Sequence, residues 1–278
     1  GPSVPFRAVV AINPWAESHA HGIGLAKLPG AFEFPVPGVR FARPAQADGV
    51  EVGHVIVVEP EGSDGVHVQT SGNHIWDRPQ LRPYLDKMDH ILRPANYPVG
   101  MPGRGSGVYQ LDDGRKIGVL NIEGRDYLSR IDCPFRIAEA ELTLMRRETQ
   151  TIFVDFHAEL PQEKAAMAFH LDGRVSMLVG THTHIQTADE KILPKGTGFI
   201  TDVGMTGAYD SVIGMKKKAA IGRFISGIPH KFSVAEDDPR VAGVMIDIDD
   251  DGRTTAIKRI FEKISEGNYD PDQKGQED

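Results

Sequence analysis

The stretch Thr151-Ile152-Phe153-Val154-Asp155-Phe156-His157 combines β-branched and aromatic residues and predicts a buried strand that ends on a histidine. Residues 161–170 begin with a proline and have the pattern of a helix, and residues 175–179 form a second apolar run typical of a strand. A strand, a helix and a strand in this order indicate α/β layering.

Further patterns surround this unit. Two pairs of apolar segments flank polar turns and predict β-hairpins: residues 108–111 with 116–122, and residues 241–248 with 254–261. Helices are predicted for residues 78–88, 137–148 and 216–224, and strands for residues 7–12, 54–58 and 196–203. We expect a mixed sheet, or two sheets flanked by helices, in one domain that spans residues 1–278.

Composition narrows the class of protein. The chain has 278 residues, of which 40% are hydrophobic and 25% charged, as in ordinary globular proteins. Cys133 is the only cysteine, which excludes an internal disulfide and a thiolate zinc cluster and fits a cytoplasmic protein. A net charge of −8 argues against a stable nucleic-acid complex, although bound cations would still allow a nucleotide substrate. The sequence predicts no membrane partner and leaves a homo-oligomer open.

Three polar clusters follow β-prone runs and suggest a metal site. His157 ends one strand, the segment Thr181-His182-Thr183-His184 follows the next, and Asn73 with His74 lies upstream. On an extended segment, residues two apart point to the same side, so His182 and His184 could reach one ion or two adjacent ions. An isolated pair would more often be surface or core histidines, but the three clusters together favour a metal site.

The first cluster contains a ligand candidate and an acid candidate. Asn73 can bind a metal through its amide oxygen, and His74 beside it could serve as a general acid. The alternative is a simple turn that leads into a helix capped by Asp77.

Other polar residues give weaker signals. Asp155 is predicted to orient a metal-bound histidine, as carboxylates often do. Glu159 fits the start of a helix as well as a functional role. Arg104, between two glycines, could bind a phosphate, and a plain turn explains that segment equally well.

Five motifs together resemble a known family: Gly72-Asn73-His74-Ile75-Trp76-Asp77, Leu92-Arg93-Pro94-Ala95-Asn96-Tyr97-Pro98, Asp155-Phe156-His157-Ala158-Glu159, Gly180-Thr181-His182-Thr183-His184 and Thr201-Asp202-Val203-Gly204-Met205-Thr206-Gly207. They look like the bacterial YmdB-type family of calcineurin-like metallophosphoesterases, over about residues 66–261. The resemblance implies a four-layer α/β/β/α sandwich and a centre of two divalent or trivalent ions, commonly iron or manganese.

The resemblance also implies an activity and residue roles. It implies phosphodiester hydrolysis by metal-bound hydroxide, with 2′,3′-cyclic nucleotides as the expected substrates. Asn73, His157 and His182 would bind one ion and His184 the other, and His74 would be the general acid.

The first 65 residues depart from that family. They are rich in proline and lack both the strand that ends in Gly-Asp and the strand that ends in Asn-Gly-Glu-Asn, whose carboxylates bind the ions. Asp48 does not follow a strand, so Glu61, or Glu59, after residues 54–58 is the predicted substitute for the bridging carboxylate. At the other end, residues 268–278 are polar and predict a flexible tail.

Three explanations follow from this departure. The chain is an active enzyme with substitute ligands from its N-terminal segment or a neighbouring subunit; or it is a non-catalytic relative that binds one metal or none and acts as a nucleotide-binding or regulatory protein; or residues 4–65 come from a shifted reading frame. We favour the enzyme, because the ligands and the acid that follow Gly72 are all present.

Overall fold

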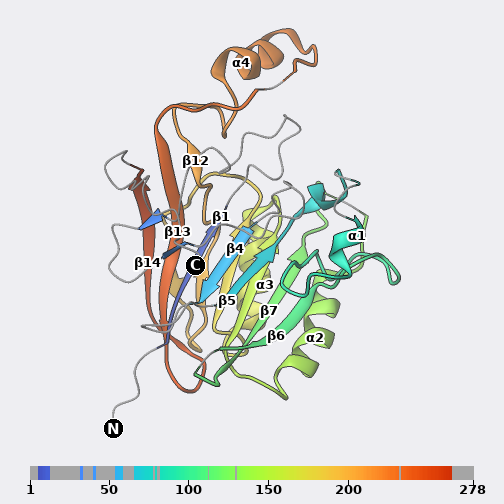
Figure 1. Ribbon diagram of the computed structural model, residues 1–278, viewed down its shortest axis with the longest axis vertical. Coiled ribbons are helices and arrows are strands. Elements are labelled where there is room, and N and C mark those ends of the chain that lie inside the picture. The colour runs from blue at the N-terminus through green and yellow to red at the C-terminus, as the bar shows by residue number, and fades with distance from the viewer. Residues whose placement is uncertain are drawn as a thin grey trace, which may run out of the picture.

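The computed structural model describes residues 6–12, 32–33, 40–41, 54–58, 66–77, 79, 82–111, 113–128, 130–231 and 233–264 (Figure 1). Two six-stranded sheets dominate this part of the chain. A separate small pair consists of β2 (Phe32–Glu33) and β3 (Arg40–Phe41). The predicted α/β class is confirmed.

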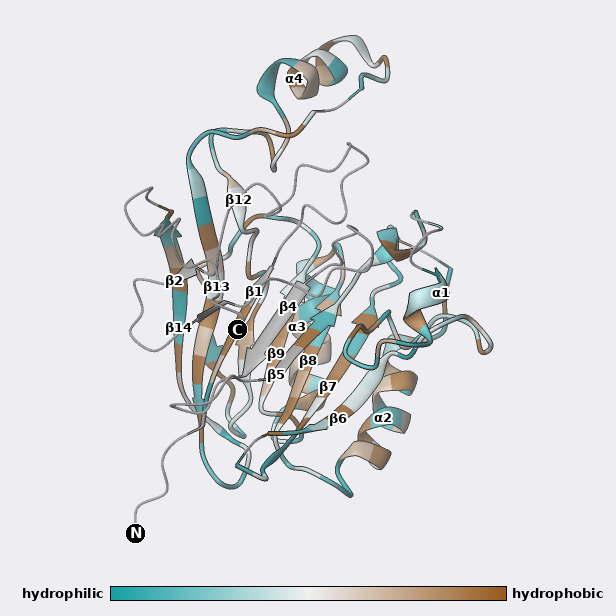
Figure 2. Cartoon of the chain, viewed as in Figure 1, coloured by the Kyte–Doolittle hydropathy of each residue, from teal (hydrophilic) through white to brown (hydrophobic). Residues whose placement is uncertain are grey.

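The first sheet is antiparallel in all its strand pairs. Its order is β12-β13-β1-β4-β5, with β14 also paired to β13. The strands are β1 (Phe6–Ile12), β4 (His54–Val58), β5 (Val66–Thr70), β12 (Gly207–Ala208), β13 (Pro239–Ile248) and β14 (Thr254–Lys263). The predicted strands at residues 7–12 and 54–58 and the C-terminal hairpin are confirmed, and the hairpin carries both hydrophilic and hydrophobic stretches along its length (Figure 2).

The second sheet is mixed, with the order β10-β11-β9-β8-β7-β6. Its inner strands β7, β8, β9 and β11 are parallel, and β6 and β10 are antiparallel at its edges. The strands are β6 (Ser106–Gln110), β7 (Lys116–Glu123), β8 (Ile152–His157), β9 (Met177–Thr181), β10 (Lys191–Ile192) and β11 (Gly198–Ile200). β11 is shorter than the predicted strand over residues 196–203, because the chain bends at Thr201, directly after Ile200.

The helices lie in the connections: η3 (Asn73–Trp76, a 3-10 helix), α1 (Arg82–Leu85), α2 (Pro134–Met145), α3 (Pro161–Leu171) and α4 (Lys217–Ser226). α2 and α3 begin at a proline, which has no N–H to lose in the first turn. The helix predicted for residues 78–88 extends too far at its carboxyl end, because α1 ends at Leu85 and residues 86–88 are not helical. Residues 78, 80 and 81 of that prediction lie outside the described residues. None of the helices described in the structure is long and apolar enough to cross a membrane.

Two hydrophobic layers position the second sheet. Alternate residues of β8 point to opposite faces: Phe153 packs with Val68 and Val244 between the two sheets, whereas Val154 and Phe156 pack against α2 and α3. Figure 1 shows these two helices on the far side of the second sheet and α4 away from both sheets. The full four-layer order stays a prediction.

The carboxyl ends of β5, β8 and β9 lie together, and we call this end of the sheets the functional edge. His157 and Thr181, at the carboxyl ends of β8 and β9, are neighbours in the sheet, and Thr70 at the end of β5 bonds to Asp155 of β8. β4 runs the other way, because Val58 at its end pairs with Val66 at the start of β5. Glu59 and Glu61 lie outside the described residues, and Glu61 stays a predicted ligand.

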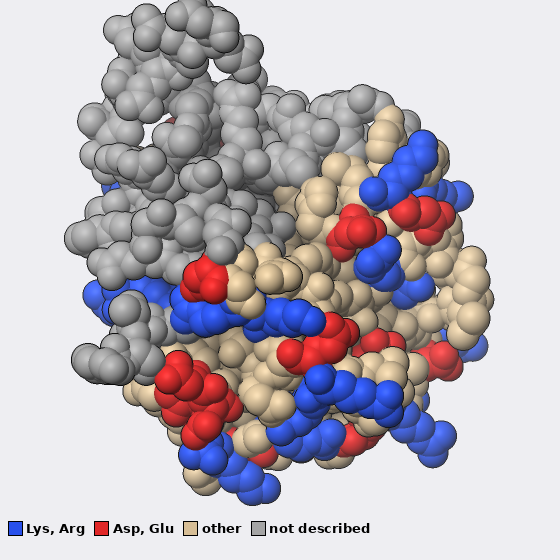
Figure 3. Space-filling model, turned by 60° about the horizontal axis from the view of Figure 1, so that its bottom comes forward, with Lys and Arg blue, Asp and Glu red and all other residues tan. Residues whose placement is uncertain are grey.

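The opposite, lower face carries both signs of charge. On the described part of the face in Figure 3, lysine and arginine side chains lie among aspartate and glutamate side chains. The described part of this face therefore presents charges of both signs side by side.

Candidate functional site

Three candidate ligands converge at the functional edge. Asn73 Oδ1 lies 2.9 Å from His157 Nε2, and His182 Nδ1 lies 3.1 Å from the same nitrogen. The two imidazole rings meet edge to face, with centroids 4.8 Å apart. His157 is fully buried, whereas Asn73 and His182 are half-buried. The structure therefore brings together residues that are 84 positions apart in the chain.

A chain of hydrogen bonds fixes the tautomer of His157. The buried Asp155 carboxylate accepts hydrogen bonds from the hydroxyls of Thr70 and Thr181, the latter at 2.9 Å. Because Thr181 donates to Asp155, its oxygen accepts from His157 Nδ1, 3.0 Å away. In the neutral ring the lone pair of His157 is therefore on Nε2, the nitrogen that faces Asn73 and His182. The predicted orienting role of Asp155 thus runs through Thr181.

Glu159 orients the second imidazole in a similar way. His182 Nε2 lies 3.0 Å from Glu159 Oε2, and a carboxylate can only accept, so this nitrogen carries the hydrogen. The lone pair of the neutral His182 ring is then on Nδ1, toward His157. Two imidazole lone pairs and one amide oxygen converge, which is the donor set of a transition-metal site.

Space and spacing both fit a cation. Neighbouring ligands at ~2.1 Å from one octahedral ion lie about 3 Å apart, close to the 2.9 and 3.1 Å separations here. Gly72 keeps the front of His157 open, since a Cβ at Gly72 would lie 2.2 Å from His157 Nε2. Asn73, His157 and His182 could therefore hold a metal ion.

His74 lies beside this group. It follows Asn73 on η3, its side chain is 31% exposed, and its Nδ1 lies 2.8 Å from Asp77 Oδ2. Asp77 was expected to cap a helix, but it holds the ring of His74 instead. A histidine oriented in this way at a solvent-accessible edge can transfer a proton.

The structure corrects the geometry expected for His182 and His184. β9 ends at Thr181, and both histidines have a left-handed backbone, with φ of 103° and 64°, so the two-residue period of a strand does not apply. His184 Nδ1 lies 3.5 Å from the carbonyl oxygen of Ile213.

Other predicted residues lie apart or outside the described ranges. Arg104 forms an exposed ion pair with Asp89 at 2.6 Å, and Glu61 is outside those ranges. Within the described residues there is no group of three or more His, Cys, Asp or Glu side chains that could hold a metal, so the convergent set depends on the amide of Asn73.

Sequence reasoning missed several residues of this edge. Thr70 and Thr181 have no signal of their own beyond their positions at the ends of strands. Glu123 ends β7 next to His157 and is fully buried, and Tyr97 donates a hydrogen bond to it at 2.9 Å. A charged residue at the end of an apolar strand is the signal that could have identified it.

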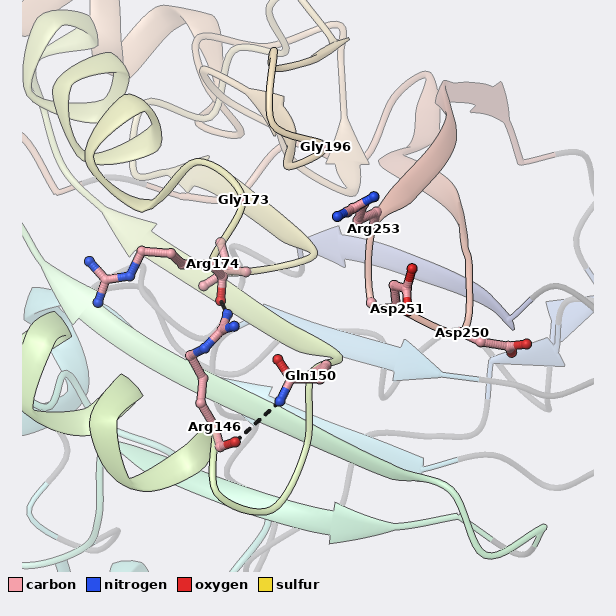
Figure 4. Close-up of a pocket in the computed structure, with 10 residues that line it drawn as sticks. Arg146, Gln150, Gly173, Arg174, Gly196, Asp250, Asp251 and Arg253 are labelled. Atoms are coloured by element: carbon pink, nitrogen blue, oxygen red, sulfur yellow. Dashed lines mark hydrogen bonds between the residues drawn. The ribbon is translucent and has the colours of Figure 1, made fainter.

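A cavity of about 330 Å³ lies at the other edge of the second sheet. It opens at the amino ends of β8, β9 and β11 and is lined by Arg146, Arg174, Arg253 and Asp251, among others (Figure 4). Glu139 binds Arg174 through two hydrogen bonds, so the charge of this arginine is already compensated. The cavity is separate from the candidate metal ligands.

Comparisons with known proteins agree with these features. A family model described as YmdB-like protein matches residues 57–260. The chain is 45% identical over 201 residues to a 2′,3′-cyclic-nucleotide 2′-phosphodiesterase of Bacillus subtilis, covering 72% of this chain and 75% of the relative. It is 31% identical to a putative phosphatase/phosphodiesterase of Mycoplasma pneumoniae, covering 81% of this chain and 80% of that protein.

Solved structures are similar as well. A novel phosphatase from Mycoplasma pneumoniae superposes with a TM-score of 0.66 and 31% identity, over 72% of this chain and 73% of that chain. A hypothetical protein from Thermus thermophilus gives a TM-score of 0.65 and 36% identity, over 73% and 77% of the two chains.

Proposed function

The chain belongs to the YmdB-like family and is a phosphoesterase, and we propose that its substrates are small phosphodiesters of the 2′,3′-cyclic nucleotide class. The relative from Bacillus subtilis carries this substrate in its name. The convergence of Asn73, His157 and His182 is the observation that supports the proposal most strongly.

The three converging side chains would hold one metal ion. Phosphoesterases of this family generally use divalent metals. When bound, such an ion supplies a Lewis acid for the phosphoryl group and a nucleophile at neutral pH. The protein presents its lone pairs without rearrangement, because Thr181 and Glu159 already fix the two rings.

His184 would be among the ligands of a second ion in the proposed centre, and iron or manganese would suit this nitrogen and oxygen donor set. The remaining ligands of the second ion would come from residues outside the described ranges or from a neighbouring subunit. A protein with one metal, acting as a nucleotide-binding or regulatory protein, is the alternative, and the lack of a carboxylate cluster among the described residues favours it.

His74 is the proposed general acid. Its position next to Asn73 would place it at the leaving oxygen of a bound phosphodiester, and the 2.8 Å contact with Asp77 would keep its ring oriented. Proton transfer of this kind contributes about 10²–10⁴-fold to a rate.

The fold proposal follows the same resemblance. We propose a four-layer α/β/β/α sandwich in a single domain; the core between the sheets and the core beneath α2 and α3 support three of its layers. A cytoplasmic location stays a prediction.

Metal analysis and hydrolysis assays test this function together. The purified chain should contain at least one metal ion and should hydrolyse 2′,3′-cyclic AMP and bis-p-nitrophenyl phosphate. His182→Ala should lose both properties, and the control His170→Ala, at the exposed pair with Glu139, should retain both. Metal binding without turnover would favour the regulatory alternative, and absence of both would contradict the proposal.

A further inference from the structure

A buried ion pair lies next to the loop that carries the two candidate histidines. Lys164 of α3 donates to Asp202 across 2.8 Å, and both side chains are almost completely buried, at 0% and 1% exposure. Removing two charges from water is costly, and buried pairs often contribute little net stability. The pair therefore calls for an explanation other than stability alone.

Asp202 contacts the residue that separates the two histidines. Its Oδ2 accepts hydrogen bonds from the backbone N–H and the hydroxyl of Thr183, at 3.1 and 2.9 Å, in addition to the bond from Lys164. Its Oδ1 accepts from the N–H of Gly204 at 2.9 Å. One carboxylate thus connects residues 182–184, here called the histidine loop, to the segment that follows β11.

The backbone on both sides of Thr183 is unfavourable for L-residues. His182 and His184 have φ of 103° and 64°, values that neither residue adopts readily, so surrounding contacts must maintain them. The two hydrogen bonds from Thr183 to Asp202 act midway between these residues and are suited to that task.

Gly180 provides the room for this arrangement. A Cβ at Gly180 would lie 1.8 Å from the carbonyl oxygen of Thr201 and 2.7 Å from Cδ of Lys164. The absence of a side chain lets the stem of Lys164 pass under β9 to reach Asp202. The glycine at the start of the Gly-Thr-His-Thr-His motif therefore serves the lysine as well as the strand.

We infer that Lys164 and Asp202 are positioning residues, which hold Thr183 and so keep His182 and His184 in the conformation that binds metal. The inference rests on the proposed metal site. It gives the buried charges a role in the loop geometry, because Lys164 keeps the Asp202 carboxylate compensated where it accepts four hydrogen bonds.

Calorimetric titration of the metal-free chain with Mn²⁺ tests the inference. Thr183→Val removes one hydrogen bond to Asp202 without leaving a buried charge, and we expect it to weaken Mn²⁺ affinity about 10–100-fold, as for other partners that orient metal ligands. Thr183→Ser retains the hydroxyl and should bind Mn²⁺ like the wild type. The neutral pair Lys164→Met with Asp202→Asn should weaken binding as well, with the melting temperature of the metal-free form measured alongside.

Controls separate a positioning role from a structural one. Thr254→Val removes a buried hydroxyl that donates to Ser176 at the far edge of the sheet, and it should leave Mn²⁺ affinity unchanged. A lower melting temperature with unchanged Mn²⁺ affinity in Thr183→Val and in the neutral pair would overturn the inference while leaving the metal site intact. Equal Mn²⁺ binding by the wild type and by His182→Ala would overturn the metal site and the inference with it.

Discussion

His157 Nε2 and His182 Nδ1 face each other across 3.1 Å, each with a lone pair directed at the other when the rings are neutral. Thr181 and Glu159 hold the hydrogens on the opposite nitrogens. Two lone pairs repel at this distance, so a cation bound by both nitrogens would stabilise the folded protein as well as serve the hydrolysis.

Replacement of His157 should therefore abolish metal binding at this position. For His157→Ala we expect loss of bound metal and a fall in turnover of more than about 100-fold, because loss of a ligand costs more than loss of a residue that only orients one. Elemental analysis and hydrolysis of 2′,3′-cyclic AMP measure the two effects. Full metal content in this variant would exclude His157 as a ligand.

Thr181→Val should show how much the fixed tautomer of His157 contributes to metal affinity. The substitution preserves shape but removes the oxygen that accepts from His157 Nδ1, so we expect Mn²⁺ affinity to fall about 10–100-fold. Thr197→Val, at a buried hydroxyl that donates to Val175 at the other edge, is the matched control. Equal affinities in the two variants would show that the hydroxyl of Thr181 does not orient the ligand.

Gly72→Ala should fill the space next to His157 in the candidate metal site. Its Cβ would lie 2.2 Å from His157, so the ring must shift, at a cost of about 1–3 kcal/mol in the free energy of unfolding and with loss of metal affinity. Gly222→Ala, in α4 with its nearest contact at 3.4 Å, should be neutral or slightly stabilising. Thermal unfolding with and without Mn²⁺ distinguishes the two, and an unchanged response to Mn²⁺ in Gly72→Ala would contradict the expectation.

His74→Ala should affect substrates according to their leaving group. A general acid matters most when the leaving oxygen is strongly basic, so hydrolysis of 2′,3′-cyclic AMP should fall about 10²–10⁴-fold. Hydrolysis of bis-p-nitrophenyl phosphate, whose leaving group needs little protonation, should fall much less. Equal losses on both substrates would exclude the acid role.

The pKa of Asp189 predicts that the free energy of unfolding depends on pH. Burial alone would raise its pKa, but hydrogen bonds from Thr187 and Thr201 outweigh burial and hold the pKa below the ordinary value of 3.8. A lowered folded pKa means that the ionised group stabilises the fold above about pH 4, and that this contribution is lost as the pH falls through the folded value.

The variant Asp189→Asn checks this sign. At pH 7 it should lower the free energy of unfolding by about 1 kcal/mol, allowing for solvent around this half-buried group. The difference from the wild type should shrink as the pH is lowered below 4 in denaturant titrations. A difference that does not depend on pH would argue against the ionised carboxylate.

Local sequence patterns predicted those helices and strands that are determined by hydrophobic periodicity and residue composition. The strand over residues 151–156 and the helix that begins at Pro161 were predictable, because β-branched residues and a proline at the first helical position act within a few residues. The candidate ligands Asn73, His157 and His182 followed from motifs at the ends of such elements.

Contacts between distant residues were not predictable in the same way. Nothing local indicates that Asp155 accepts from Thr70, 85 residues away, or that Asp202 reaches back to Thr183. The left-handed backbone at His182 and His184 also escaped prediction, since histidine adopts it in only a minority of positions and tertiary contacts impose it here.

The complete burial of Lys164 also makes this side chain a reporter of motion. Reagents that modify amines reach it only after α3 has lifted from the second sheet, whereas exposed lysines such as Lys217 react at once. The rate at which Lys164 becomes labelled, followed by mass spectrometry, would thus record how often the helix detaches from the sheet. A bound ligand that stabilises the histidine loop would lower this labelling rate.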